Sequence, residues 1–404
     1  AVKKLQALLF PAPHQGHLTP AVNLALKLAS EGFSITFVVF EYLHRKLSAI
    51  HKQGTSEFDL FSEAHNKSGL KIDYTTIADG LPDDFDREAR LVEFYEYLMN
   101  EFQPLVDEFV GEKIRSDPDT TYFIVSDTIL LWQAAAAEKY NLLHVSFWTQ
   151  PSMVYSLGWH SELLREHGHY PLKDNIEEDV DYVPGIQSVN TRDFMPYLRP
   201  SHPFYDLGAR AFDLSKKADF VLHNTVQELE SSILSALNKY KPNYAIGLTN
   251  TYGDLVKIPT KKSLWAESDC TRWLESKAPS SVLYISFGSM VLASDQVIEE
   301  IVHGVILSQV NFIWVTRHGD KGSPLNIILP AAFDDEFKDR GLIVPWCDQI
   351  KVLSSPSVGA FLTHCGWNSV MESIWCGIPM LCYPVEADQP TNKKLVVDDW
   401  KVGL

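Results

Sequence analysis

Residues 346–389 read WCDQIKVLSSPSVGAFLTHCGWNSVMESIWCGIPMLCYPVEADQ, and this stretch decides the fold of the C-terminal part of the chain. A short apolar run at 358–363 leads into the polar turn HCGWNS at 364–369. An apolar-periodic segment at 370–376 then ends at a glycine, and a second apolar run covers 378–382. A strand, a polar turn, a helix, a glycine stop and a second strand together predict a βαβ unit.

The polar turn of this unit is predicted to lie where parallel sheets usually bind their ligands. The crossover places it at the carboxyl end of the first strand. Ser369 and Glu372 have the spacing of a capping box, which would point the backbone N–H groups of the first helical turn into the same crevice. A helix start of this kind suits a phosphate without a metal. The stretch is therefore predicted to hold an anion.

The composition excludes several classes of protein. A length of 404 residues favours two domains, and a net charge of −17 argues against a nucleic-acid partner, because no basic stripe is present. No apolar run approaches the roughly 20 residues that span a bilayer, and residues 1–10 run directly into a strand pattern instead of a signal-peptide cleavage site. The five cysteines include no C-x-x-C pair, which favours reduced thiols over a zinc site. We therefore expect a cytoplasmic protein without membrane insertion.

Strand and helix patterns alternate in both halves of the chain, which predicts parallel α/β architecture. We expect an N-terminal domain at 1–237, a linker at 238–262 and a C-terminal domain at 263–404, with a ligand cleft between the domains. Predicted strands lie at 5–10, 33–40, 121–125, 142–147, 220–225, 282–286, 312–316, 341–345, 358–363 and 378–382. The chain ends in what reads as mid-element, so we expect a C-terminal segment to be missing from it.

Two segments before the third of these strands are interpreted separately. Residues 41–90 read as polar and irregular, while 91–109 read as one amphipathic helix rich in aromatic residues. Most of these aromatic rings are expected in the core, although some could line an apolar pocket.

His17 and Asp127 are the candidate catalytic residues of the N-terminal half. His17 is expected just before a helix, whose positive end disfavours protonation and keeps the imidazole available as a base. Asp127 follows another strand and could hold the tautomer of that imidazole. Two unrelated polar residues at strand ends remain the alternative. His14 and His17 could also suggest a metal, but no third ligand is nearby.

Several residues of the C-terminal half are candidates for binding an anion or a sugar. Gly288-Ser289 forms another glycine-bearing turn after a strand, with backbone donors. Trp346 offers a flat face to a base or sugar, with a buried core position as the alternative. Glu372 either completes the capping box or accepts hydrogen bonds from a diol. The polar side chains that follow the strands are His364, Asn368, Ser369, Asp388 and Gln389.

These residues resemble a known family. The stretch 346–389 is similar to the signature of plant family-1 UDP-dependent glycosyltransferases in its length, its HCGWNS core and its closing Asp-Gln. Its opening Trp-Cys-Asp-Gln departs from the commoner Trp-Ala-Pro-Gln. The likeness extends to GHLTP at 16–20, SD at 126–127, FWT at 147–149, NT at 224–225 with ELE at 228–230, and SFGS at 286–289.

The resemblance implies a GT-B fold, in which two Rossmann-like domains face a central cleft and the C-terminal domain holds most of the donor. Trp346 would stack on uracil, the Cys347 backbone and Gln349 would contact uracil and ribose, and Glu372 would bind the ribose hydroxyls. The diphosphate would be held without a metal by Ser289, His364, Asn368 and Ser369. The sugar would be held by Thr149, Trp367, Asp388 and Gln389.

The activity implied is that of an inverting UDP-glucose-dependent O-glucosyltransferase acting on a small hydrophobic acceptor of phenolic, flavonoid or terpenoid type. His17 would deprotonate the acceptor hydroxyl with Asp127 behind it, and a closing Gln389 goes with UDP-glucose in the family. We expect no metal cofactor, and we expect the protein to be a monomer. The alternatives are another donor sugar, glucose esters formed on carboxylates, or a UDP-sugar-binding protein without turnover. A nicotinamide-dependent dehydrogenase is disfavoured because the G-x-G-x-x-G fingerprint is missing.

Overall fold

The computed structural model describes residues 4–55, 57–174, 176–248, 260, 262–289, 295–316 and 339–404. The chain divides into two compact units, Ala1–Leu264 and Trp265–Leu404, which are described separately as the N-terminal and C-terminal units. Within the described residues, no helix combines the length and the apolar character that crossing a membrane requires.

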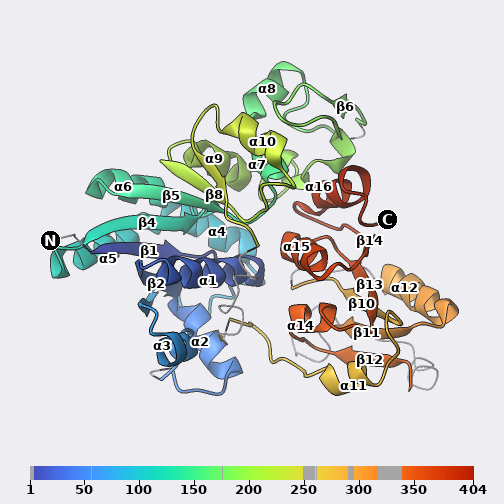
Figure 1. Ribbon diagram of the computed structural model, residues 1–404. Helices are drawn as coiled ribbons and strands as arrows, with labels where there is room; N and C mark the ends of the chain where they lie inside the picture. Colours follow the sequence, from blue (N-terminus) through green and yellow to red (C-terminus); the bar gives the residue numbers. More distant parts are fainter. Residues whose placement is uncertain are drawn as a thin grey trace. The chain divides into compact units, whose positions relative to one another are not determined.

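The N-terminal unit is built on a seven-stranded parallel sheet with the order β3-β2-β1-β4-β5-β8-β9 (Figure 1). Its central strands are almost entirely buried, which is why they read as continuous apolar runs in the sequence. A small antiparallel pair, β6 with β7, lies outside this sheet. The strands are β1 (Leu5–Phe10), β2 (Ser34–Phe40), β3 (Ile72–Ile77), β4 (Thr121–Asp127), β5 (Leu143–Trp148), β6 (Asp179–Val180), β7 (Val189–Asn190), β8 (Phe220–His223) and β9 (Asn243–Ala245).

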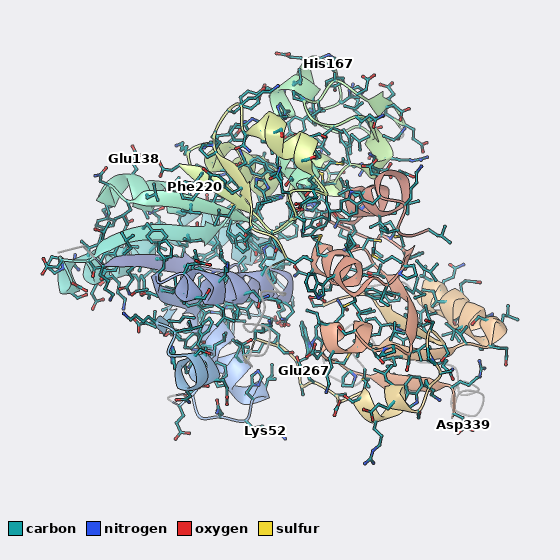
Figure 2. All side chains as sticks on the ribbon, in the orientation of Figure 1. Lys52, Glu138, His167, Phe220, Glu267 and Asp339 are labelled. Carbon is teal, nitrogen blue, oxygen red and sulfur yellow. The ribbon has the colours of Figure 1, made fainter. Side chains whose placement is uncertain are left out.

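Helices connect these strands and bury apolar side chains against them. In α1, for example, the apolar residues from Leu18 to Leu26 are buried, whereas on α6 the exposed Glu138 points outward (Figure 2). The helices of this unit are α1 (Gln15–Ser30), α2 (Glu41–Ile50), α3 (Ser62–Ser68), α4 (Leu91–Asn100), α5 (Gln103–Ser116), α6 (Gln133–Tyr140), α7 (Ser152–Trp159), α8 (Ser161–Glu166), α9 (Tyr205–Ser215) and α10 (Ser231–Leu237), with 3-10 turns η1 (Thr191–Asp193) and η2 (Pro196–Leu198).

The prediction of one helix over 91–109 is wrong, because the segment breaks between α4 and α5. Pro104 lies in the first turn of α5. In a continuous helix its ring would clash with the carbonyl of Asn100, where α4 ends. The prediction that 41–90 is irregular is also wrong, since this segment contains α2, α3 and β3. Their short, half-polar patterns are those of an edge strand and of helices with a narrow buried side.

Part of the segment expected as a linker, 238–262, belongs to the N-terminal sheet. Strand β9 pairs in parallel with β8, and the buried Asn243 at its start exchanges hydrogen bonds with Asn238 (2.7 and 3.0 Å). Residues 249–259 and 261 of that expected linker lie outside the described part of the chain. At its end, the Leu264 amide donates to the Gln15 side chain (2.7 Å).

The C-terminal unit is built on a five-stranded parallel sheet with the order β12-β11-β10-β13-β14. Alternate residues of its strands face opposite sides: Val282 and Tyr284 pack with α11 and α14, while Ile285 and Phe287 pack with α12 (Figure 1). The strands are β10 (Val282–Ser286), β11 (Asn311–Val315), β12 (Gly341–Val344), β13 (Val358–Thr363) and β14 (Met380–Cys382). The helices are α11 (Thr271–Glu275), α12 (Asp295–Ser308), α14 (Gln349–Leu353), α15 (Trp367–Cys376) and α16 (Gln389–Lys394), with a π-helical turn η5 (Leu395–Asp399).

The βαβ unit predicted for 346–389 is confirmed as β13, α15 and β14. The helix ends at Cys376, and Gly377 follows in the left-handed conformation (φ 69°) that glycine adopts without strain. The predicted β1, β10 and β13 have the observed bounds, and the other predicted strands differ at their ends by one or two residues.

Candidate active site

Each sheet has one place where its chain order reverses. In the N-terminal unit β1 lies between β2 and β4, and in the C-terminal unit β10 lies between β11 and β13. The carboxyl ends of such strands diverge into helices on opposite faces, which leaves the crevice where open α/β sheets bind ligands. In the N-terminal unit His17 follows β1 and Asp127 ends β4, while in the C-terminal unit Ser289 follows β10 and His364 follows β13. These four predicted site residues thus lie at the two reversal points, whereas Thr149, Trp346, Asp388 and Gln389 follow other strands.

His17 and Asp127 form a hydrogen-bonded pair at the reversal point of the N-terminal unit. His17 Nδ1 lies 2.6 Å from Asp127 Oδ2, and the two side chains are 17% and 2% exposed. The Thr149 hydroxyl lies 3.0 Å from the same nitrogen. An ionised carboxylate only accepts, so Nδ1 must carry the proton, and Nε2 of the neutral ring has the lone pair. This arrangement can remove a proton from a hydroxyl group.

The other oxygen of Asp127 is also engaged. Oδ1 accepts the backbone N–H of Ile129 at 3.2 Å. The two bonds together fix the plane of the carboxylate, and so the plane in which His17 is held. Thr149, which the family resemblance assigned to the sugar, has its hydroxyl at this pair as well. Sequence spacing gave no signal that the two residues would meet.

His14 lies directly beside this pair, with its ring centroid 6.2 Å from that of His17 and 5.7 Å from that of Tyr95. Burial, together with the nearby charges of His17 and Lys46, lowers the pKa of His14 to about 3. The ring is therefore neutral near neutral pH. Among the described residues, no group of three or more His, Cys, Asp or Glu side chains is arranged to hold a metal ion.

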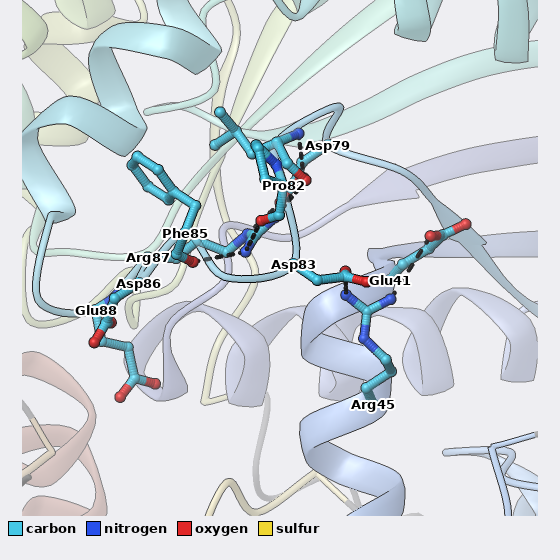
Figure 3. A network of polar contacts seen from close by, with 10 residues as sticks. Glu41, Arg45, Asp79, Pro82, Asp83, Phe85, Asp86, Arg87 and Glu88 are labelled. Atoms are coloured by element: carbon cyan, nitrogen blue, oxygen red, sulfur yellow. Dashed lines mark hydrogen bonds and ion pairs between the residues drawn. The ribbon is translucent and has the colours of Figure 1, made fainter.

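A buried ion pair fixes the loop between β3 and α4 (Figure 3). The guanidinium of Arg87 donates to both carboxylate oxygens of Asp79, at 2.6 and 2.9 Å, and both side chains are 6% exposed. It also donates to three backbone carbonyls, those of Leu81 (3.1 Å), Pro82 (3.2 Å) and Phe85 (2.8 Å). The planar guanidinium group thus links four residues of the loop through hydrogen bonds. This ion pair was not predicted from the sequence.

In the C-terminal unit, Gln349 forms hydrogen bonds with two other residues that are predicted to bind the UDP-sugar. Its amide nitrogen donates to Glu372 Oε2 (2.7 Å) and to Ser369 Oγ (3.0 Å), and its amide oxygen accepts the hydroxyl of Tyr284 (3.2 Å). The capping box predicted for Ser369 and Glu372 is wrong. Helix α15 starts earlier, at Trp367, and its N-cap Gly366 has no side chain with which to cap it. The first-turn N–H groups therefore have no side-chain cap.

Trp346 and Cys347 lie beside this network. The ring of Trp346 is tilted by 33° against that of Trp265, with centroids 4.5 Å apart, so one of its faces is already covered. The Cys347 thiol is buried, 3.6 Å from the hydroxyl of Tyr284. Tyr284 thus supports both Cys347 and Gln349 from inside the core. It was not predicted, because a tyrosine in an apolar strand reads as core.

His364 lies between two glycines. A Cβ atom at Gly288 or at Gly366 would come within 2.4 Å of His364 Nε2, so only glycine leaves room for the ring at both positions. Burial lowers the pKa of His364 to about 4, against the opposing effect of the Ser286 backbone, which lies close enough to interact with the ring although no hydrogen bond to Nδ1 meets strict geometry. The ring is therefore neutral near neutral pH and has one N–H group and one lone pair.

The last two residues of the signature are held by their own loop. Asp388 Oδ2 accepts the amide of Asn392 (2.8 Å), which also donates to the Cys365 carbonyl (2.8 Å). Gln389 Oε1 accepts two backbone N–H groups, at 2.9 Å each, from residues 385 and 386. Asn392 was not predicted, although its position four residues after Asp388 on one helix was a usable signal. The other residues predicted to bind the UDP-sugar are Trp367, Asn368 and Ser289. Trp367 and Asn368 lie in the first turn of α15, where Trp367 is buried, and Ser289 lies half-buried after β10.

The structure thus has two parallel α/β units, one with a hydrogen-bonded histidine–carboxylate pair and the other with a glycine N-cap beside a neutral histidine, an arrangement compatible with a nucleotide-dependent transferase. Comparisons with known proteins agree with this class. Residues 223–403 match the family model described as UDP-glucoronosyl and UDP-glucosyl transferase. The whole chain is 45% identical to UDP-glycosyltransferase 86A1 of Arabidopsis thaliana, covering 82% of it, and 35% identical to 7-deoxyloganetin glucosyltransferase of Catharanthus roseus, covering 84% of it.

A solved structure shows the same fold. The crystal structure of UDP-glucose: anthocyanidin 3-O-glucosyltransferase in complex with UDP superposes with a TM-score of 0.81 at 25% identity, over 100% of this chain and 86% of that one. The chain belongs to the plant family-1 UDP-glycosyltransferases. It is therefore a GT-B glycosyltransferase of plant secondary metabolism, with a UDP-sugar as co-substrate and a small molecule as acceptor, and the predicted family, fold and enzyme class are confirmed.

Proposed function

We propose that this enzyme is an inverting UDP-glucose-dependent O-glucosyltransferase that glucosylates a hydroxyl group of a small hydrophobic acceptor. The observation that carries the proposal is the 2.6 Å hydrogen bond between His17 Nδ1 and the buried Asp127 carboxylate. A protein that only binds a UDP-sugar has no need of a base held in one tautomer. The donor is proposed to be UDP-glucose, on the tendency of the family when the signature closes with Gln389.

The proposed chemistry is a single displacement. His17 Nε2 takes the proton of the acceptor hydroxyl while the acceptor oxygen attacks the anomeric carbon. The bond from that carbon to the diphosphate oxygen breaks, and UDP leaves with the electron pair. Attack from the face opposite UDP converts the α-linked donor into a β-glucoside. The carboxylate of Asp127 stabilises the imidazolium that forms on His17.

We assign the nucleotide to the C-terminal unit. The face of Trp346 that is not covered by Trp265 would stack on uracil, with the Cys347 backbone and Gln349 at uracil and ribose. Glu372, already accepting from Gln349, would bind the ribose hydroxyls. The diphosphate would be held by Ser289, His364, Asn368 and Ser369, and the sugar by Trp367, Asp388, Gln389 and, from the N-terminal unit, Thr149.

The state of His364 and of the α15 N-terminus supports the diphosphate assignment. Neutral His364 can donate one hydrogen bond to a phosphate oxygen without the cost of a buried charge. The N–H groups of the first turn of α15 have no side-chain cap, so they can bind an anion at the positive end of the helix.

A small hollow lined by apolar side chains lies at the carboxyl ends of β1, β2 and β3. Its volume is about 10 Å³, which is room for roughly one water molecule. Ligand pockets usually have about 300–1,000 Å³, so what this hollow contributes to the proposal is the apolar character of its lining and not space for an acceptor ring. Its lining residues are Phe10, Pro11, Val38, Phe40, Ile77, Phe102, Leu130 and Trp132.

The test is UDP release from UDP-glucose with a panel of phenolic, flavonoid and terpenoid acceptors. His17→Ala should lower kcat by about 10²–10⁴-fold and leave the UDP dissociation constant, measured by calorimetry, nearly unchanged. The control is His167→Ala, an exposed histidine of the same unit (Figure 2), which should behave as wild type.

Three results would contradict the proposal. If the wild-type enzyme binds UDP but releases none with any acceptor, it is a binding protein. If NMR coupling shows an α-glucoside, the inverting mechanism is wrong. If only carboxylate acceptors react, the enzyme forms glucose esters instead.

A further inference from the structure

We propose that Tyr95 and His14 form a second polar contact for the acceptor, which binds an uncharged oxygen group separate from the hydroxyl that is glucosylated. The inference rests on the proposed function, because it concerns the acceptor of that reaction. It narrows the acceptor class to small hydrophobic molecules that have a carbonyl or a second hydroxyl group in addition to the reacting one.

The hydroxyl group of Tyr95 has no partner within the described residues. Tyr95 lies on α4, its side chain is 4% exposed, and its hydroxyl oxygen is buried without a hydrogen bond. Buried hydroxyl groups are almost always bonded, because an unpaired one has lost its bonds to water without replacement. An oxygen atom of a bound acceptor would provide the missing bond.

His14 presents a second polar atom without a partner. Its Nε2 is buried and has no hydrogen bond in the described part of the chain. The His14 ring is 5.7 Å from the Tyr95 ring and tilted by 31° against it, and it is 6.2 Å from the ring of His17. The rings that carry the two unpartnered atoms are therefore neighbours, and the His14 ring is also a neighbour of the proposed base His17.

The charge state of this contact favours an uncharged ligand group. Burial lowers the pKa of His14 to about 3, and burial together with the charge of Asp127 raises the pKa of Tyr95 well above 10. Both groups are neutral at the pH of the cell. Neither group itself offers a positive charge to a carboxylate. The charge of Asp127 acts on Tyr95 and would repel a carboxylate, whereas the charge of Lys46 acts on His14 with the opposite sign, so the nearby charges give a carboxylate no one-sided attraction. A carbonyl or hydroxyl oxygen has no net charge, so it needs no positively charged partner and is not repelled by Asp127.

The position of Tyr95 is held from several sides. Its ring packs edge-on against Phe94 (5.8 Å) and Phe204 (6.0 Å). The loop that leads into α4 is fixed by the buried pair of Arg87 and Asp79 (Figure 3). A hydroxyl group held in this way can select an acceptor by geometry, because it cannot turn away to find another partner.

The experiment combines two enzymes with matched acceptors. Wild type and Tyr95→Phe are compared on phenol, resorcinol, 3-hydroxyacetophenone and 3-hydroxybenzoate, by kcat/KM for UDP release and by quenching of tryptophan fluorescence on acceptor binding. The second oxygen group should raise kcat/KM of the wild type over phenol by roughly ten-fold, and Tyr95→Phe should remove that advantage while leaving phenol unchanged. Wild type should favour the uncharged ketone over the carboxylate.

Matched variants separate this role from a structural one. Tyr155→Phe removes another buried tyrosine hydroxyl of the same unit, one that donates to Ser215 (3.0 Å), and should change neither acceptor preference nor UDP affinity. His14→Phe, which keeps an aromatic ring but removes the nitrogen, should weaken the preference for the second oxygen group in the same direction as Tyr95→Phe.

The result that overturns the proposal is a Tyr95→Phe enzyme that changes kcat/KM equally for acceptors with and without the second oxygen group. A preference of wild type for 3-hydroxybenzoate over the ketone would also overturn it. Failure of the proposed function looks different, since wild type would then release no UDP with any acceptor. The fluorescence titration still reports the preference in that case, because it requires no turnover.

Discussion

The substitution Asp127→Asn tests the proposed catalytic pair by replacing one carboxylate oxygen with an NH₂ group in a side chain that stays the same size. In the native enzyme, Asp127 Oδ1 accepts the Ile129 N–H at 3.2 Å and Oδ2 accepts His17 Nδ1–H at 2.6 Å. An asparagine has only one oxygen. If that oxygen keeps the bond to Ile129, the amide NH₂ group faces Nδ1 of His17. The ring must then accept at Nδ1 and carry its proton on Nε2, which removes the lone pair that would take the acceptor proton.

The magnitude follows from the lost interaction. A buried hydrogen bond to a charged group contributes about 1.5–3 kcal/mol, and each 1.36 kcal/mol in a barrier is tenfold in rate. The value of kcat should therefore fall by about 10- to 150-fold, and further if the tautomer changes as described. The KM for UDP-glucose should change little, because Asp127 is not among the residues assigned to the donor.

The assay is steady-state UDP release, with UDP affinity and thermal unfolding measured in parallel. The control is Asp213→Asn, which makes the same chemical change at a carboxylate that is 71% exposed and pairs with Lys216. It should leave kcat unchanged. A kcat for Asp127→Asn within two- or threefold of wild type, in a folded enzyme, would refute the view that this carboxylate supports the base.

Three further predictions concern stability and donor binding. Burial lowers the pKa of His144 to about 4, below its ordinary value near 6.5. The contribution of the neutral ring to stability is therefore fully present above pH 6.5, and the free energy of unfolding, measured with urea, should fall by about 3 kcal/mol as the pH falls from 6.5 through 4. A His144→Asn variant whose free energy of unfolding depends on pH as in the wild type would contradict this prediction. Gly366→Ala places a Cβ within 2.4 Å of His364 Nε2 and should weaken UDP binding, measured by calorimetry, at least about tenfold. The control Gly304→Ala has no described atom within 4 Å of the new Cβ and should leave UDP affinity unchanged. Equal UDP affinities of the two variants would contradict the diphosphate assignment. Arg87→Ala leaves a buried carboxylate unpaired and should lower the free energy of unfolding by about 3–5 kcal/mol, while Arg45→Ala, at an exposed pair, should change it little; similar effects of both would be contrary to the argument.

Local sequence patterns were sufficient for much of the fold. Strands buried on both faces read as continuous apolar runs, so β1, β10 and β13 could be placed from the sequence. The patterns were insufficient where an element lies at an edge, as with β3, or where one residue overrides a periodic pattern, as Pro104 does between α4 and α5. The capping box failed for a related reason: the spacing of Ser369 and Glu372 fitted a cap, but the helix begins two residues before Ser369.

The sequence by itself determined the family, the two parallel α/β units and the residue types that a UDP-sugar transferase requires. Those follow from short-range patterns and from a long signature at 346–389. The tertiary structure decided which of these residues meet. His17 and Asp127 are 110 positions apart, and only the adjacency of β1 and β4 in the sheet brings them within 2.6 Å. In the same way, burial by elements distant in sequence gives His14 its neutral state and leaves the Tyr95 hydroxyl without a hydrogen bond to any described residue, because the pKa and the hydrogen bonding of a side chain depend on its surroundings in space.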